Sequence, residues 1–300
     1  MTAAGAAPAD VVLPSPLASL THIPWFAKRW IAARPLAWRC YTFLCRRAGW
    51  GGAFLGWHTP VNGSFAGIRT MALHANHLWV PVGIYEVGVS RCLITLLREL
   101  TRGAAGTDVW DVGANEGRLS LLCARHGASR VLAIEPSASN VAILSRHVAA
   151  NPDIGGRIEV LQAAISDHDG QVDFITNVED GVLCQIQSPD VTGHDHGTAG
   201  SVGVVASLQL DTLRATRPAP ALVKIDVEGA EVLVLRGAAR LLEIDRPLVL
   251  VEIHNSAAGR ASLELLRGAG YHCDRLDAAG RPSAVGREFA SGHLVARPGR

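Results

Sequence analysis

Apolar and polar residues alternate in a regular pattern from residue 107 onward. Apolar runs of five to seven residues end in turn residues, and helical apolar spacing follows most of them. Such runs predict buried strands, and the 3.6-residue spacing predicts amphipathic helices. Strands are expected at 108–112, 130–134, 157–162, 221–227, 247–253, 271–276 and 292–296. Helices are expected at 116–126, 138–150, 229–243 and 259–269, with a short amphipathic helix before them at 91–102.

This alternation of strands and helices predicts an α/β fold with a mostly parallel sheet that is covered by helices on both faces. Between residues 162 and 221 the pattern is irregular, and neither strand nor helix is predicted there. In open α/β sheets, ligands bind outside the carboxyl ends of the strands, where the strand order reverses. Functional residues are therefore expected at the strand ends.

The first 85 residues differ in composition from the rest of the chain. Residues 11–85 contain seven basic residues and no acidic one, and six of the seven tryptophans lie there, although the whole chain has a net charge of only +1. We therefore predict a basic, Trp-rich N-terminal extension over residues 1–85 and an α/β domain over residues 86–300. Within the extension, we predict that the Ala/Pro-rich residues 1–22 are disordered and that residues 24–48 form a helix.

The extension has three interpretations. It could be a cap packed on the α/β domain, a helix that lies on an anionic membrane surface through residues 24–48, or a nucleic-acid arm. Six basic residues within 28–47 are few for a nucleic-acid arm, and the remainder of the chain is acidic, so no nucleic-acid partner is expected. The cap and the peripheral membrane contact both stay open, as does the oligomeric state.

Composition narrows the class of protein. The 300 residues are 48% hydrophobic and 18% charged, which excludes a disordered chain and predicts a sizeable core. The six cysteines are scattered without a CxxC pair, as expected for free thiols in a reducing compartment. The first twenty residues have no basic segment of the secretory type, and no apolar run approaches the roughly 18 residues of a spanning helix. A cytoplasmic location is expected, with the inner membrane surface as the alternative.

The first predicted strand runs into the sequence DVGANEG at residues 111–117. Gly113 permits a tight turn that a ligand can approach, and Gly117 lets the next helix pack close to the strand. Dinucleotide-binding proteins use G-x-G-x-x-G here to hold an anionic pyrophosphate. In this chain Asn115 replaces the second glycine and Asp111 adds a negative charge, which favours a cationic cofactor such as S-adenosylmethionine.

Glu135 and Pro136 end the second predicted strand, with Glu135 lying 24 residues after Asp111. An acidic residue at this place can accept hydrogen bonds from both hydroxyls of a ribose. The alternative is an acid in a solvated turn.

The fourth and fifth predicted strands carry charges near their carboxyl ends. Lys224, Asp226 and Glu228 alternate with apolar residues, and so do Glu252 and His254. Side chains two residues apart in a strand share one face, and charges in a buried parallel strand are costly unless they are paired. If the two strands are neighbours, five ionisable groups meet beside the glycine turn.

Three segments together resemble the FkbM family of S-adenosylmethionine-dependent methyltransferases: DVGANEG at 111–117, IEP at 134–136 and, most specifically, KIDVEGAE at 224–231. The resemblance covers about residues 85–295. It implies a Rossmann-like class I methyltransferase fold, with a seven-stranded sheet that has one antiparallel edge strand. It also implies O-methylation of a hydroxyl on a sugar, polysaccharide or secondary metabolite, with a small-molecule or glycan acceptor as partner.

The resemblance also assigns cofactor residues by position. The turn is expected to contact the methionine part of the cofactor, and the end of the second strand its ribose. The backbone after the third strand is expected to contact the adenine, although the family's usual acidic residue is absent there. The assigned residues are Asp111, Gly113, Ala114, Asn115, Glu135, Pro136, Ala164 and Ile165, with Asp167 as a further contact for the adenine.

Catalytic roles follow from the charged strand ends. Asp226 is the first candidate to position or deprotonate the acceptor hydroxyl, and His254 is the alternative base. Lys224 could keep Asp226 ionised or orient the acceptor. The non-catalytic interpretation is a structural ion pair of Lys224 with Glu252 or Glu228.

Three further interpretations belong to weaker signals. Glu231 is interpreted as a first-turn acid that the helix dipole favours. The sequence His194-Asp195-His196 is interpreted as part of a solvated loop, so no metal site is predicted, and residues 188–201 could form a lid over the acceptor.

For the whole chain, a nicotinamide-dependent oxidoreductase and a non-catalytic protein that docks on a membrane or partner are the alternatives to a methyltransferase.

Overall fold

A computed structural model of the protein describes residues 56–61, 63–72, 85–102, 106–177, 184–186 and 200–299. The chain divides into two units, Met1–Val87 and Gly88–Arg300, and each is described by itself. The predicted helix at 24–48, the sequence His194-Asp195-His196 and almost all of the predicted lid lie outside the described residues.

The described part of the first unit contains a small antiparallel pair of strands, β1 Gly56–His58 and β2 Thr70–Ala72. Phe65 and Ile68, from the connection between the strands, are buried. The guanidinium of Arg69 lies 5.2 Å from the ring centre of Trp57, a cation–π distance.

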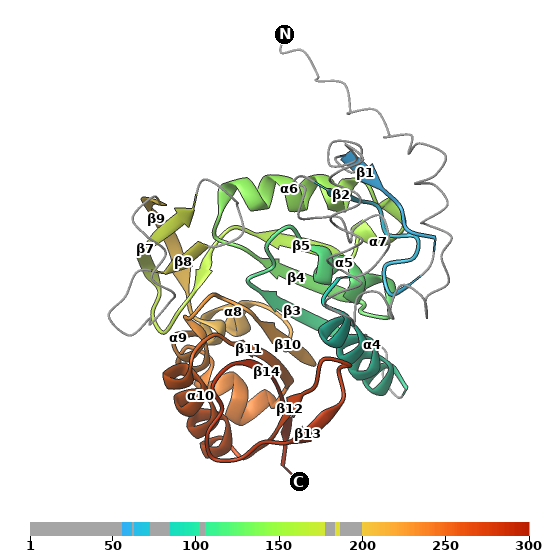
Figure 1. The fold of residues 1–300 in the computed structure, drawn as a ribbon. Helices are drawn as coiled ribbons and strands as arrows, with labels where there is room; N and C mark the ends of the chain where they lie inside the picture. The colour runs from blue at the N-terminus through green and yellow to red at the C-terminus, as the bar shows by residue number, and fades with distance from the viewer. Residues whose placement is uncertain are drawn as a thin grey trace, which may run out of the picture. The chain divides into compact units, whose positions relative to one another are not determined.

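The second unit is built on one large sheet (Figure 1). Its strands are β3 Asp108–Val112, β4 Arg130–Ile134, β5 Ile158–Leu161, β10 Leu222–Ile225, β11 Leu248–Ile253, β12 Tyr271–Leu276, β13 Pro282–Ala284 and β14 Gly292–Pro298. They lie in the order β13-β12-β14-β11-β10-β3-β4-β5. All seven predicted strands are present. The short β13 adds an antiparallel edge strand, and β14 runs antiparallel between β11 and β12.

The helices of this region alternate with the strands, as predicted. They are α4 Val87–Thr101, α5 Arg118–Arg125, α6 Ala138–Ala149, α7 Pro152–Gly155, α8 Leu210–Thr216, α9 Glu231–Arg236, the π-helix η3 Leu241–Asp245 and α10 Ser256–Gly268. The single helix predicted at 229–243 is wrong, because α9 ends before Gly237. There the chain passes so close to Ser166 that a Cβ on Gly237 would lie 2.0 Å from the Ser166 carbonyl oxygen.

The strand order reverses between β3 and β10, which are parallel neighbours. Because parallel crossovers are right-handed, α5 and α6 cover one face of the sheet and α9 and α10 cover the other. Val112 and Ile225 face the second side and pack in the main core with Val234 of α9. Asp111 and Lys224, which are paired in the strand register, therefore face the first side.

A second sheet lies where the sequence pattern looked irregular. It consists of β6 Ala164–Ile165, β7 Gly170–Asn177, β8 Cys184–Ile186 and β9 Gly200–Leu208, in the order β6-β9-β7-β8. Val172 and Phe174 of β7 are buried and their neighbours are not, so the alternation of a half-buried strand was present in the sequence. These side chains pack against Ala230 and Leu233, so the second sheet borders the segment that follows β10.

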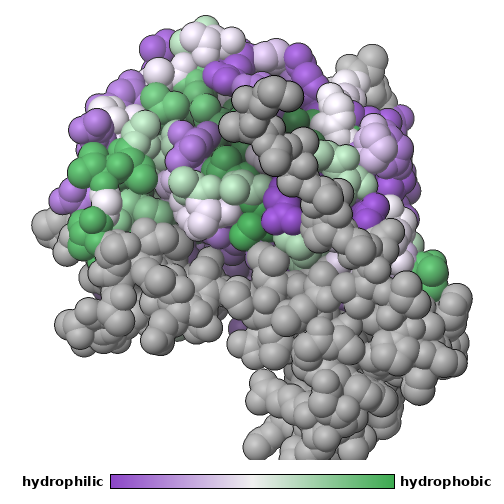
Figure 2. All heavy atoms as spheres, turned by 90° about the horizontal axis from the view of Figure 1, so that it is seen from above, coloured by the Kyte–Doolittle hydropathy of each residue, from purple (hydrophilic) through white to green (hydrophobic). Residues whose placement is uncertain are grey.

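The described surface carries few exposed large hydrophobic residues. Figure 2 shows hydrophobic and hydrophilic residues interspersed on the face seen from above. Val202 and Val204 of β9 are 58% and 61% exposed. These two side chains lie two residues apart and therefore share one exposed face of β9.

None of the described helices has the length and apolar character that a membrane-crossing helix needs. The described thiols of Cys92, Cys123 and Cys273 are free and buried, as expected for unpaired cysteines. Burial raises the pKa of Cys92 and of Cys273 to about 11, so these two are not reactive thiolates at neutral pH.

Candidate active site

The glycine turn after β3 and the loop after β10 meet at the carboxyl edge of the sheet, where the strand order reverses. The backbone N–H of Asp226 donates to the carbonyl oxygen of Val112 at 3.0 Å. Gly113 has a φ of 74°, and a Cβ built on it would lie 1.7 Å from the Asp226 carbonyl oxygen. Only glycine fits there, so the contact between the two loops requires Gly113.

Lys224 joins these two loops. Its Nζ lies 3.3 Å from Oδ1 of Asp111 and 3.3 Å from Oδ2 of Asp226, and it donates to the carbonyl oxygen of Gly113 at 3.1 Å. Asp111 is 1% exposed, and its Oδ2 also accepts a hydrogen bond from Ser120 Oγ at 2.5 Å. The sequence had suggested Asp226 as a partner of Lys224 but not Asp111. Lys224 therefore fixes the position of Asp226 relative to the glycine turn.

Glu135 lies behind the glycine turn at the end of β4. Its Oε2 accepts from the backbone N–H of Asn115 at 2.9 Å, and its Oε1 accepts from Ser137 N at 3.0 Å and from Asn140 Nδ2 at 3.3 Å. Burial raises the pKa of Glu135, and these hydrogen bonds act in the opposite direction. Pro136 follows at the strand end, and Ser137 caps α6.

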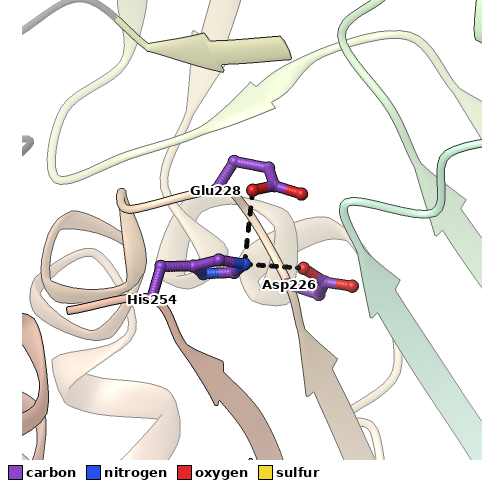
Figure 3. A group of neighbouring side chains, drawn as sticks. All are labelled: Asp226, Glu228 and His254. Atoms are coloured by element: carbon purple, nitrogen blue, oxygen red, sulfur yellow. Dashed lines mark ion pairs between the residues drawn. The ribbon is translucent and has the colours of Figure 1, made fainter. Parts of the chain in front are cut away.

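Four carboxylates surround the imidazole of His254, which follows β11. Its Nδ1 lies 2.6 Å from Oε1 of Glu231. Its Nε2 lies 3.3 Å from Oε2 of Glu228, 3.7 Å from Oδ1 of Asp226 and 4.0 Å from Oε1 of Glu252. Figure 3 shows Asp226 and Glu228, from the loop after β10, on the side of the imidazole that carries Nε2. We call Asp226, Glu228 and His254 the acidic cluster.

Proton affinities in the cluster are shifted by burial and by neighbouring charges. Burial, with Asp226 and Glu252 nearby, raises the pKa of Glu228 to about 7, although the charge of His254 opposes the rise. Burial disfavours a charged His254, but the hydrogen bond to Glu231 and the surrounding carboxylates outweigh it and raise the pKa of His254 to about 9. Burial raises the pKa of Glu252, but the hydrogen bond from His293 and the nearby positive charges outweigh burial, so the pKa of Glu252 is lowered.

Two residues of the site were missed or misjudged from the sequence. Glu231 lies in the first turn of α9, but it is 0% exposed, and its Oε1 accepts from Gly229 N at 2.8 Å besides contacting His254. His293 lies on β14 opposite Glu252, and its Nε2 is 3.0 Å from Glu252 Oε2. The only signal for His293 was the pairing of two distant strands, which the sequence pattern does not reveal.

The structure corrects the reason why the charged residues come together. The prediction placed Lys224, Asp226 and Glu228 on one face of a strand, but β10 ends at Ile225. Asp226 and Glu228 belong to the following loop, where Glu228 has a φ of 50°. The loop turns Glu228 towards His254, and the meeting of ionisable groups that the sequence predicted is nevertheless present.

Ala164 and Ile165 form the short strand β6. Both residues are 2% exposed, backbone included, and pack in two different hydrophobic clusters. Asp167, two residues further, has its Oδ1 2.9 Å from His168 Nδ1 and its pKa is lowered by that hydrogen bond.

The strand order, the glycine turn and the acid after the second parallel strand define a class I methyltransferase fold. The family model described as the methyltransferase FkbM domain matches residues 111–273, which is more than half of the chain. The chain belongs to the FkbM methyltransferase family.

One relative by sequence and two solved structures are similar to this chain. The hexuronic acid methyltransferase AglP of Haloferax volcanii is 29% identical over 179 residues, which cover 58% of this chain and 67% of the relative. The crystal structure of methyltransferase FkbM from Methylobacillus flagellatus is 20% identical with a TM-score of 0.42 over 66% of this chain and 45% of that one, so the alignment spans less than half of that relative. A precorrin-6y C5,15-methyltransferase from Geobacter metallireducens is 12% identical with a TM-score of 0.40 over 71% and 88% of the two chains. Both TM-scores are below 0.5, so the fold assignment depends on the strand order and the family model.

Proposed function

We propose that this methyltransferase uses S-adenosylmethionine to methylate a hydroxyl oxygen of a sugar-containing acceptor, with a hexuronic acid as the first acceptor to test. The observation that carries the proposal is the contact made by Lys224. Its ammonium group joins the glycine turn, where a cofactor would bind, to Asp226, where an acceptor would bind. The hexuronic acid comes from the name of the Haloferax volcanii relative.

The donor set around the glycine turn fits S-adenosylmethionine. Each oxygen of a carboxylate can accept two hydrogen bonds, so Glu135 has capacity left for a ribose hydroxyl on Oε2. The carboxylates beyond Lys224 favour a cationic ligand. When bound, S-adenosylmethionine supplies an electrophilic methyl group on a positively charged sulfur. An anionic pyrophosphate finds no comparable support, because the N–H of Asn115 already donates to Glu135.

We assign the cofactor contacts as the sequence suggested. The turn residues hold the methionine part, the end of β4 holds the ribose, and the backbone of β6 borders the adenine. Asp111 acts indirectly, because its carboxylate is buried and contacts Ser120 and Lys224. The direct contacts are assigned to Gly113, Ala114, Asn115, Glu135, Pro136, Ala164 and Ile165.

In the acceptor half of the site, Asp226 takes the proton that the acceptor hydroxyl loses during methyl transfer. A positioned general base of this kind typically contributes about 10²–10⁴-fold to the rate. Lys224, 3.3 Å from Oδ2, orients the carboxylate of Asp226. The side chain of Asp226 is 21% exposed, so an acceptor is able to reach it. The second sheet, which packs on Ala230, lies beside this half of the site.

Replacing Glu135 by alanine is expected to weaken the binding of S-adenosylmethionine by about 1–3 kcal/mol, since a charge-assisted hydrogen bond to the ribose is lost. Isothermal titration calorimetry with the cofactor measures this, and a thermal melt checks that the fold is kept. Glu159 of β5, which is 60% exposed and pairs with Arg217, supplies the control variant Glu159→Ala. Equal cofactor affinity in the Glu135→Ala and Glu159→Ala proteins would remove Glu135 from the ribose site.

The acceptor is tested with radiolabelled S-adenosylmethionine and matched sugars that differ only at C6, glucuronic acid and glucose, each at the end of the same oligosaccharide. The proposal expects an alkali-stable methyl ether, formed preferentially on the uronic acid. An alkali-labile methyl ester would show that a carboxylate oxygen is the acceptor and would overturn O-methylation of a hydroxyl. Label on neither sugar would reject sugar acceptors of this kind.

A further inference from the structure

The acidic cluster has the composition and spacing of a metal site. One atom each of Asp226, Glu228 and His254 lies within 4.8 Å of the other two. Nε2 of His254 is 3.3 Å from Glu228 Oε2 and 3.7 Å from Asp226 Oδ1. Ligand atoms at about 2.1 Å from one ion are separated from one another by about 3.0–3.5 Å, so small side-chain adjustments bring all three onto one ion.

His254 is held in the way that metal-binding histidines are held. Its Nδ1 lies 2.6 Å from Oε1 of Glu231, a carboxylate that is 0% exposed. When Nδ1–H donates to this carboxylate and an incoming ion displaces the proton from Nε2, the lone pair of Nε2 points towards Asp226 and Glu228 (Figure 3). A carboxylate behind the distal nitrogen is the usual support of a metal-ligating imidazole, where it fixes the tautomer and the ring orientation.

A second observation concerns the charge that is gathered here. Glu231 Oε2 is buried and has no hydrogen-bond partner among the residues that the structure describes. Four carboxylates lie within 4.0 Å of the His254 ring. Lys224 contacts Asp226, His293 contacts Glu252, and a protonated His254 adds one positive charge, but four carboxylates in one place are costly unless still more positive charge is present. A divalent cation would supply it.

We propose that Asp226, Glu228 and His254 bind a divalent cation of the Mg²⁺ or Mn²⁺ type. Two carboxylates favour these hard ions, and the single imidazole favours Mn²⁺ over Mg²⁺. The side chains are 21%, 27% and 12% exposed, so the remaining coordination positions are open to water and to oxygens of an acceptor. The role of the ion at the acceptor depends on the proposed methyl transfer, in which Asp226 binds the ion through Oδ1 and takes the acceptor proton on Oδ2, whereas the binding of the ion does not depend on it.

The test is a titration of the full-length protein with Mn²⁺, followed by the loss of the free-ion signal in electron paramagnetic resonance. The expected result is one Mn²⁺ per chain, displaced by excess Mg²⁺. His254→Gln and Glu228→Gln should each weaken binding at least about 10-fold, and Glu231→Gln should weaken it about 10–100-fold through the lost support of His254. His272 of β12, 3.3 Å from Asp274, provides the control His272→Gln, which should bind as the wild type does.

Two results would overturn the site: no stoichiometric Mn²⁺ binding by the wild-type protein, or the same affinity in all four variants. Cofactor calorimetry on each variant identifies any that fail to fold, and the two independent ligand variants keep the test decisive if one does. The methyl-transfer assay separates the two proposals. Mn²⁺ binding without methyl transfer supports the metal site and rejects the proposed function. Methyl transfer that persists in chelator, without Mn²⁺ binding, does the reverse.

Discussion

Replacing Asp226 by asparagine is expected to lower the rate of methyl transfer by about 10²-fold or more. The substitution keeps the shape of the side chain but removes the charge that lies 3.3 Å from Lys224 Nζ, in the proposed acceptor half of the site. Cofactor affinity should change much less than the rate, because the ribose is assigned to Glu135. Steady-state kinetics with an acceptor that the enzyme methylates measure the rate, and cofactor calorimetry measures the affinity.

The matched control is Asp274→Asn on β12. Asp274 also contacts a histidine, His272, but it lies outside the acidic cluster, so its loss should leave the rate unchanged. Wild-type turnover in the Asp226→Asn protein would contradict a catalytic role and leave the carboxylate with a structural one. If His254→Gln lost the larger share of the rate and Asp226→Asn little, Asp226 would not be the base.

Replacing Lys224 by methionine is expected to destabilise the fold by about 3–5 kcal/mol, since removing one partner of a buried ion pair leaves the other charge uncompensated. The charge left uncompensated is that of Asp111, which is 1% exposed. Urea denaturation at neutral pH measures the free energy of unfolding. Adding Asp111→Asn to Lys224→Met should restore a large part of the loss, because the buried charge is then gone as well.

Arg130→Met provides the control for this prediction. Arg130 of β4 lies 2.6 Å from Asp108 of β3, but the side chain of Arg130 is 63% exposed. Water screens such a pair, so its loss should change stability little. If Lys224→Met cost no more than Arg130→Met, the ammonium group of Lys224 would not compensate Asp111, and the link between the two loops would need another explanation.

The main sheet could be predicted from the sequence because its strands are buried on both faces. Such strands are continuous apolar runs, and the residues that end them, Gly113 and Glu135, mark where the chain turns. All seven predicted strands are present, with boundaries that shift by a few residues. The ligand end of the sheet followed from the same pattern, since parallel strands place their carboxyl ends at one edge.

The missed features depend on contacts between residues that are far apart in the sequence. The second sheet needs β7 to pair with β9 across more than twenty residues, and its outer valines on β9 hide the usual alternation of buried and exposed positions. His293 meets Glu252 only because β14 enters the sheet beside β11. Asp226 and Glu228 were predicted on a strand because the alternation continues past Ile225, although the hydrogen-bonded pairing stops there.

The second sheet begins and ends at the same place. Ala164 is paired with Ser207 and Ile165 with Leu208, and the N–H of Ser166 donates to the Leu208 carbonyl oxygen at 3.0 Å. With both ends tied together in this way, a twofold change in the length of the intervening chain costs only about 0.6 kcal/mol in closure entropy. The second sheet is therefore a module that can be lengthened, shortened or exchanged between relatives while the two halves of the main sheet stay intact. Because the module packs against Ala230 and Leu233, beside the proposed acceptor half of the site, exchanging it is a way to test what sets acceptor preference.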